Sequence, residues 1–216
     1  MTAPAVETVP ERLLRAERET LVPALRDLPS GMVERVTTAC PAWTVRDVVA
    51  HCAAALVGLT AGAAYKASHD QNQRDVEERR DWPFADVLAE FERGLTVAGP
   101  AIRAAGGAKD LAALGTWIHG GDVRDALGMP DAYRSAGVPE ALEALAGCAR
   151  VVATPQVHVT LDDRELVLGA PVEDREPARL HTDVPTLFRL YTGRPADPER
   201  YRLAGARPEE LISAEW

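Results

Sequence analysis

Two histidines in this 216-residue sequence occupy positions that favour chemistry, and the first is His51. It lies in an apolar stretch, and its helical neighbours at i+4, i+7 and i+11 are Ala55, Gly58 and Gly62. Small residues beside a titratable group leave either a close helix contact or a hole that a ligand can enter. His51 is therefore a candidate ligand or catalytic residue.

The second histidine, His119, shares a predicted helical face with Gly115 and Asp122 and comes directly before the pair Gly120-Gly121. Glycine inside a helix costs about 1 kcal/mol relative to alanine, so we expect the predicted helix that carries His51, or a ligand, to approach the backbone there. Two facing histidines suit zinc, nickel or iron. A histidine beside a carboxylate is also an acid–base pair. A purely structural core histidine is the commoner case.

Composition disfavours several other classes of protein. The formal net charge of -9 opposes binding to nucleic acid and to anionic membranes. Cys40, Cys52 and Cys148 are too few and too scattered for a disulfide framework or a cysteine zinc site, so we expect reduced, mostly buried thiols. No apolar run approaches the ~18–20 residues that span a bilayer, and residues 1–10 do not resemble a signal peptide. We expect a cytoplasmic protein with a small-molecule substrate. The oligomeric state is left open, a monomer included.

Helices must position the two histidines. Apolar periodicity predicts helices over residues 9–28, 45–67, 84–102 and 110–128, and Pro139 is predicted to open a fifth. Thr44 is predicted to cap the second helix, with Asp47 at its N3 position. The strongly polar stretch 68–81 is predicted to be an exposed connection or a lid.

The pattern changes to strand period after Thr154. Apolar residues alternate over 157–161, and a turn leads to a returning strand over 165–168. Further strands are expected near 178–181 and 201–203, with a helix over 182–191 and a last helical turn over 208–212. We place a domain boundary near 153, so that a helical bundle spans 1–153 and a small α/β domain spans 154–216. A unit of about 60 residues is marginally stable alone and should pack on the bundle.

Three segments resemble, in order, the maleylpyruvate isomerase-like branch of the DinB superfamily. They are CPAWTVRDVVAH at 40–51, IHGGDV at 118–123 and LFRLYTGR at 187–194. The first is similar to the CPGWTVRDVVAHL-type segment that enters the second helix of that branch, and the second to its VHGWDL-type segment on the fourth helix. The resemblance implies an α+β protein, in which a DinB-like up-down four-helix bundle is followed by a small α/β C-terminal domain.

The resemblance also implies a chemistry. The family holds a divalent metal, usually zinc, with a histidine of the second helix and a Glu-x-x-x-His pair of the fourth. The metal lowers the pKa of a bound thiol, that of mycothiol as cosubstrate, for thiol transfer or thiol-assisted isomerisation of a cis double bond. By residue match, His51 and His119 are expected metal ligands and Asp122 is expected beside the metal. Arg194 is expected to reach an anionic group of substrate or cosubstrate.

The sequence departs from the family at one position, because the glutamate expected four residues before His119 is Gly115. Glycine has no side chain that can bind a metal. Asp122 is the nearest carboxylate on the same helical face and is a possible substitute ligand.

Three hypotheses follow, in order of preference. The first is a mycothiol-dependent isomerase or transferase with a metal at His51 and His119. The second is a metal-free enzyme for a secondary-metabolite step, in which the two histidines and Asp122 are acid–base groups and glycines 58, 62 and 115 open a substrate pocket. The third is a non-catalytic small-molecule binding protein with the same pocket.

Overall fold

A computed structural model describes residues 6–29, 31–60 and 68–212 of the chain. The chain divides into two compact units, Met1–Ala141 and Leu142–Trp216. The units part earlier in the chain than residue 153, where the sequence changes to strand period. Because the division falls inside α6 (Val138–Gly147), that helix belongs to both units.

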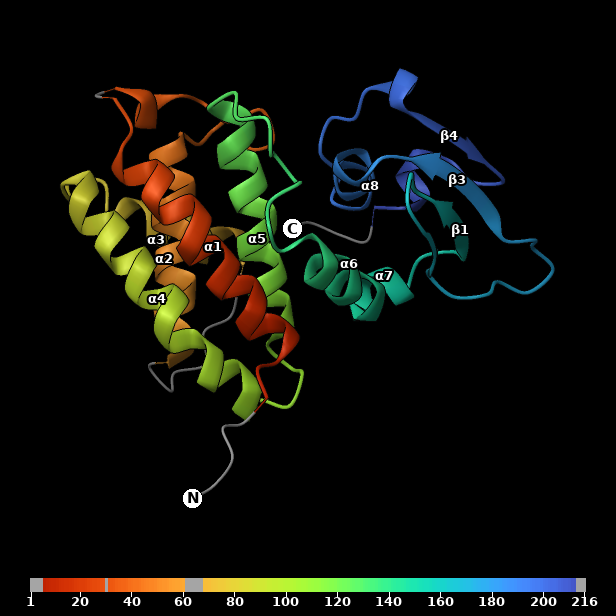
Figure 1. Ribbon diagram of the computed structural model, residues 1–216, viewed down its shortest axis with the longest axis horizontal. Helices are drawn as coiled ribbons and strands as arrows, with labels where there is room; N and C mark the ends of the chain where they lie inside the picture. The colour runs from red at the N-terminus through yellow and green to blue at the C-terminus, as the bar shows by residue number, and fades with distance from the viewer. Residues whose placement is uncertain (1–5, 30, 61–67, 213–216) are drawn as a thin grey trace. The chain divides into compact units, whose positions relative to one another are not determined.

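Within the described part of the first unit, four long helices form a bundle (Figure 1). They are α1 (Val9–Arg26), α2 (Val45–Thr60), α4 (Phe84–Ala104) and α5 (Asp110–Ala126). Helices α1 and α2 each pack against both α4 and α5, so every helix has two neighbours, as in a four-helix bundle. The side chains buried between them are mainly apolar and include Leu14, Leu21, Leu25, Val49, Leu56, Phe91, Leu95, Leu114, Trp117 and Ile118.

The predicted helices agree with the observed ones apart from their ends. Helix α4 includes Pro100 and ends at Ala104, two residues later than predicted. Helix α2 is described to Thr60, and the predicted continuation over 61–67, with Gly62, lies outside the described residues.

The predicted start of α2 is confirmed in detail. The backbone N–H of Thr44 donates to Asp47 Oδ2 at 2.9 Å, and the backbone N–H of Asp47 donates to Thr44 Oγ1 at 3.2 Å. This reciprocal pair satisfies two N–H groups that a helix start leaves without partners. It fixes the beginning of the helix that carries His51.

The segment 68–81, predicted to be an exposed connection or a lid, is largely exposed but contains a helix that was not predicted. Most of the segment forms α3 (His69–Glu77), whose N-cap Ser68 accepts a hydrogen bond from the Gln71 backbone at 3.2 Å. Helix α3 packs on α2 and buries Asp75 and Val76. The sequence hides this helix because Val76 is its only apolar residue, which is too few for a visible apolar stripe.

The second unit has a small α+β structure. The described residues form a four-stranded sheet of order β2-β1-β3-β4, from β1 (Val157–Thr160), β2 (Glu165–Leu168), β3 (Ala178–Thr182) and β4 (Tyr201–Ala204). Strands β1 and β3 are parallel, and the two outer pairs are antiparallel. The helices of this unit include α7 (Ala149–Val152) and α8 (Val184–Tyr191), and its short 3-10 turns include η2 (Pro198–Arg200) and η3 (Pro208–Glu210). A further 3-10 turn, η1 (Met32–Glu34), lies in the first unit.

The two faces of this sheet differ in burial. Val157, Val159 and Leu180 are buried on one face, while His158, Arg179 and His181 are exposed on the other. This alternation is the strand pattern that the sequence predicts. None of the helices in the described residues is long and apolar enough to cross a membrane.

Candidate functional site

Helices α2 and α5 bring the two predicted histidines together in the bundle. The ring centroids of His51 and His119 lie 5.3 Å apart, and the rings meet edge to face at 86°. Both side chains are almost withdrawn from solvent, with exposed fractions of 8% and 7%. The structure therefore places two imidazoles side by side, as the motif spacing predicts, in surroundings where their nitrogens interact with few water molecules.

Asp122 fixes the orientation of His119. Its Oδ2 lies 3.0 Å from His119 Nδ1, one helical turn away on α5, and its Oδ1 accepts a hydrogen bond from the Tyr133 hydroxyl. An ionised carboxylate only accepts hydrogen bonds, so Nδ1 carries the proton and the lone pair of Nε2 stays available. This is the arrangement of an acid–base histidine, and equally of a metal-binding one.

The glycine pair of α5 gives room to two side chains rather than to a ligand or to α2. A Cβ at Gly121 would lie under 3.0 Å from the ring of Tyr133. A Cβ at Gly120 would collide with Glu17, which pairs with Arg124 at 2.8 Å in the buried contact between α1 and α5. The expectation of a close approach is confirmed, but both predicted partners are wrong. Glu17 lies on α1 and Tyr133 on the loop after α5, so the helical pattern of this segment does not indicate them.

Tyr133 reaches Asp122 at a conformational cost. Its backbone has a φ of 56°, in the left-handed region that non-glycine residues seldom adopt, and its side chain is fully buried. Such strain persists where surrounding contacts impose it, and it clusters at functional sites. The hydrogen bond to Asp122 and the ring contact at Gly121 are among the contacts that hold Tyr133 here. Sequence reasoning missed this residue.

His51 is a neutral imidazole with an unsatisfied nitrogen. Burial, aided by repulsion from His119, lowers the pKa of His51 to about 3, so it carries no charge at neutral pH. Its Nδ1 has no hydrogen-bond partner among the described residues, and Asp75 Oδ2 of α3 lies 4.0 Å away. A buried nitrogen without a partner costs about 1–3 kcal/mol, which is tolerated where a ligand supplies the partner.

Trp43 lies beside the histidines rather than in the bundle core. Its ring centroid is 5.2 Å from that of His51, and its indole N–H donates to Gln73 Oε1 of α3 at 3.4 Å. From the size of their aromatic side chains, we expect both Trp43 and Trp117 to be core residues. This holds for Trp117, which is 1% exposed, and not for Trp43, which is half-buried. Trp43 and α3 therefore contribute walls to the site.

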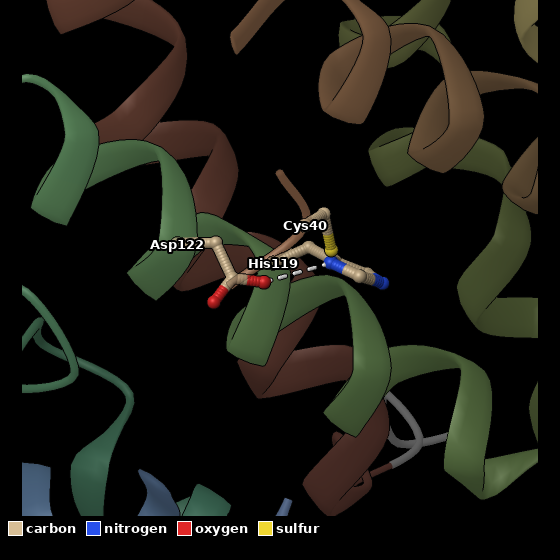
Figure 2. A group of neighbouring side chains, drawn as sticks. All are labelled: Cys40, His119 and Asp122. Carbon is tan, nitrogen blue, oxygen red and sulfur yellow. Dashed lines mark hydrogen bonds and ion pairs between the residues drawn. The ribbon is translucent and has the colours of Figure 1, made fainter. Parts of the chain in front are cut away.

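Cys40 is a further residue of the site that sequence reasoning did not select. Cys40, His119 and Asp122 each offer one ligand atom, and these atoms all lie within 4.8 Å of one another. Figure 2 shows the sulfur close to the His119–Asp122 pair, on the loop that precedes α2. All three cysteines are thiols, as expected, but only Cys52 is fully buried, and Cys40 is half-buried. The cue was the position of Cys40 directly before the predicted N-terminus of the histidine helix.

The metal set implied by the resemblance does not fit these residues. It requires a carboxylate at position 115, and a Cβ built on Gly115 would meet nothing within 4 Å among the described residues. No side chain in the described part of the chain supplies the third donor of the set at that position. Gly115 on α5 and Gly58 on α2 are both half-buried. The role of either glycine in binding a substrate stays a prediction.

Arg194 lies in the second unit, directly after α8. Its side chain is 7% exposed, and its guanidinium donates to the backbone oxygen of Thr192 at 3.2 Å. Its expected role toward an anionic group stays a prediction. A separate groove of about 610 Å³ covers the exposed face of the sheet and is lined in part by His158, Arg179 and Arg202. The lining includes none of the residues gathered around His119.

Comparisons with known proteins agree with this architecture. Residues 14–130 match the family model described as the mycothiol maleylpyruvate isomerase N-terminal domain. The fold is similar to a crystal structure of the mycothiol-dependent maleylpyruvate isomerase, with a TM-score of 0.61, 13% identity, and coverage of 93% of this chain and 94% of that one. A histidine-to-alanine variant of that enzyme gives a TM-score of 0.59 at the same identity and coverage.

A search of curated proteins gave no match. The two structural likenesses, at 13% identity, show a shared fold. The family model covers more than half of the chain and contains Cys40, His51, His119 and Asp122. This chain therefore belongs to the mycothiol maleylpyruvate isomerase N-terminal domain family.

Proposed function

We propose that this protein is a thiol-dependent enzyme, an isomerase or transferase that acts on a small organic substrate with mycothiol as cosubstrate. The observation that carries the proposal is the His119–Asp122 pair, buried beside the neutral His51 in the bundle of a family named for this thiol. The reaction of a thiol begins with the loss of its proton, and a buried, oriented imidazole is a suitable acceptor.

His119 takes the thiol proton at Nε2. Asp122 holds Nδ1–H and stabilises the imidazolium that forms, while Tyr133 keeps the carboxylate in place. His51 assists by staying neutral. Because its pKa is about 3, it carries no positive charge beside the imidazolium that forms on His119.

The thiolate then adds to one carbon of a cis double bond conjugated with a carbonyl group. A sulfur–carbon bond forms, and the π electrons move to the carbonyl oxygen. Rotation about the resulting single bond and expulsion of the thiolate give the trans isomer, and the proton returns from His119 to the sulfur. In a transfer reaction, the same thiolate displaces a leaving group and the thioether is retained.

Gly115 is the basis for proposing that the substrate differs from that of proteins with a glutamate at this position. The space beside its backbone admits substrate atoms where a glutamate side chain would stand. The metal-free acid–base hypothesis of a repurposed pocket rests on the same space. The chemical identity of the substrate is the open part of the proposal.

The test is thiol-dependent turnover of a panel of cis-enoyl acids, maleylpyruvate included, by the purified protein with and without mycothiol. His119→Gln and Asp122→Asn should each lower kcat by about 100-fold or more, the usual contribution of a positioned base. His158→Gln is the matched control, because His158 is exposed on the sheet of the second unit.

Mycothiol binding by calorimetry separates the remaining possibilities. Binding without turnover of any substrate, unaffected by His119→Gln, would favour the non-catalytic binding protein. If the protein neither binds mycothiol nor turns over any substrate with it, the proposal is overturned.

A further inference from the structure

Three donors of different chemistry converge at one point of the bundle. The sulfur of Cys40, a nitrogen of His119 and a carboxylate oxygen of Asp122 lie within 4.8 Å of one another (Figure 2). Thiolate, imidazole and carboxylate are the three ligand types that zinc takes in proteins, and catalytic zinc commonly has three protein ligands with a fourth position open. His119 and Asp122 are buried and Cys40 is half-buried, so the open position would lie towards the side of the sulfur.

The spacing of the donors suits a site that closes on its ion. Zinc lies about 2.0–2.3 Å from such ligands, so donors of a tetrahedral ion stand roughly 3.5 Å apart. From separations of at most 4.8 Å, a movement of about 1 Å per donor is sufficient.

The backbone of Cys40 is held in place for this role. The hydroxyl of the fully buried Thr37 donates to the Cys40 carbonyl at 3.0 Å and accepts from the Cys40 N–H at 3.3 Å. The Trp43 N–H donates to the same carbonyl at 2.8 Å. The loop is therefore anchored on both sides of the sulfur, and its position beside His119 does not depend on an exposed, unrestrained turn.

A second observation points to a ligand at the same place. The ring of His51 stands edge-on to His119, and its buried Nδ1 has no hydrogen-bond partner in the described structure. Imidazole is the commonest side-chain nitrogen ligand of metals in proteins. His51 thus adds a further nitrogen next to the three donors.

We propose that Cys40, His119 and Asp122 form a divalent-cation site, in which the Cys40 thiolate replaces the carboxylate that Gly115 cannot supply. The site is displaced along α5 from the set that the resemblance implies, towards the loop before α2. Zinc is the ion that this mixture of sulfur, nitrogen and oxygen favours.

This inference rests on the proposed function in one respect, the need for a thiolate at neutral pH. Proton transfer to His119 meets that need, and a bound cation meets it by charge. Proton transfer keeps the hydrogen bond between His119 and Asp122, whereas one ion bound by both side chains replaces that hydrogen bond. The two states can therefore be separated by experiment.

Cobalt(II) titration of the full-length protein, freed of metal by a chelator, tests the site directly. We expect about one ion per chain and a thiolate-to-cobalt charge-transfer absorption in the near ultraviolet. Cys40→Ser should abolish that absorption and weaken cobalt binding by more than about 100-fold. Cys52→Ser is the matched control and should retain both, because Cys52 follows His51 on α2 and is not among the three donors. Circular dichroism of each variant checks its fold.

Cobalt binding without the charge-transfer absorption, an absorption that survives Cys40→Ser, or no cobalt binding at all would overturn the site. Thiol-dependent turnover in the same preparations then keeps the two proposals apart. Turnover that persists after chelation, without cobalt binding, sinks the site and leaves the function standing. The charge-transfer absorption without thiol binding or turnover supports the site and sinks the function.

Discussion

At the scale of single residues, Gly115 stands where the resemblance implies a metal-binding glutamate. Gly115→Glu places a carboxylate four residues before His119, and a Cβ there meets nothing within 4 Å among the described residues. We expect the variant to fold and to bind zinc at least about tenfold more tightly, because the family set of His51, Glu and His119 is then complete. Competition against a chromogenic chelator measures the affinity.

Gly115→Gln is the control for this prediction, since it has the same size and no charge. Equal zinc affinity in the Glu and Gln variants would show that position 115 does not face the metal. A loss of folding in both would show that the space beside Gly115 is needed by the fold.

The site residues divide into those that local sequence indicates and those that it does not. His51, His119 and Asp122 share helical faces that motif and spacing reveal, and the structure brings all three together. Tyr133 and Cys40 join them only through the packing of distant segments, and neither has a periodic pattern. Tyr133 additionally requires a backbone conformation that its residue type disfavours.

At the scale of elements, the three glycines of α5 differ in their surroundings. Gly120 and Gly121 are crowded by side chains, whereas Gly115 has open space beside it among the described residues. Gly121→Ala should lower the free energy of unfolding by about 1–3 kcal/mol, because the new methyl group overlaps the buried ring of Tyr133. Gly115→Ala should instead raise it by about 0.5–1 kcal/mol, since alanine favours the helix and meets no neighbour. Urea denaturation measures both.

The decisive result is that Gly121→Ala and Gly115→Ala change the free energy of unfolding in opposite directions. A stabilising Gly121→Ala would mean that Tyr133 is not held against α5, and the support of Asp122 by its hydroxyl would then be in doubt. Gly120→Ala should resemble Gly121→Ala, because its methyl group meets Glu17 of the buried ion pair.

Elements with a clear apolar stripe were predictable, and those held by polar contacts were not. The four bundle helices and the strands have the expected periods, and the Thr44–Asp47 cap marks the start of α2. Helix α3 lacks a stripe, since its buried side chains are Asp75 and Val76. It is fixed by packing on α2, which no local window of sequence contains.

At the scale of the whole molecule, every donor of the proposed site lies in the first compact unit. Phe188→Ala, in the fully buried centre of α8, should cost about 3–5 kcal/mol, which a unit of this size cannot spare. We expect amides of β1, β3 and α8 to lose protection in hydrogen exchange while those of α2 and α5 keep theirs. Phe91→Ala in α4 should give the reverse pattern.

Equal loss of protection in both units with either variant would show that the chain unfolds as one cooperative body. The two-part organisation follows from the change of period along the sequence. The boundary between the two compact units could not be predicted from the change of period. It falls inside α6, which is helical on both sides of the boundary.

The position of Trp43 has an optical consequence. Its indole ring lies 5.2 Å from that of His51, whereas Trp117 is buried in the bundle and Trp82 is 39% exposed. Indole emission responds to nearby charge and is quenched by paramagnetic ions at short range. Arrival of a thiolate, or of cobalt, at the histidines should therefore dim and shift one of the protein's own chromophores, so that occupancy of the site can be followed in real time without a label.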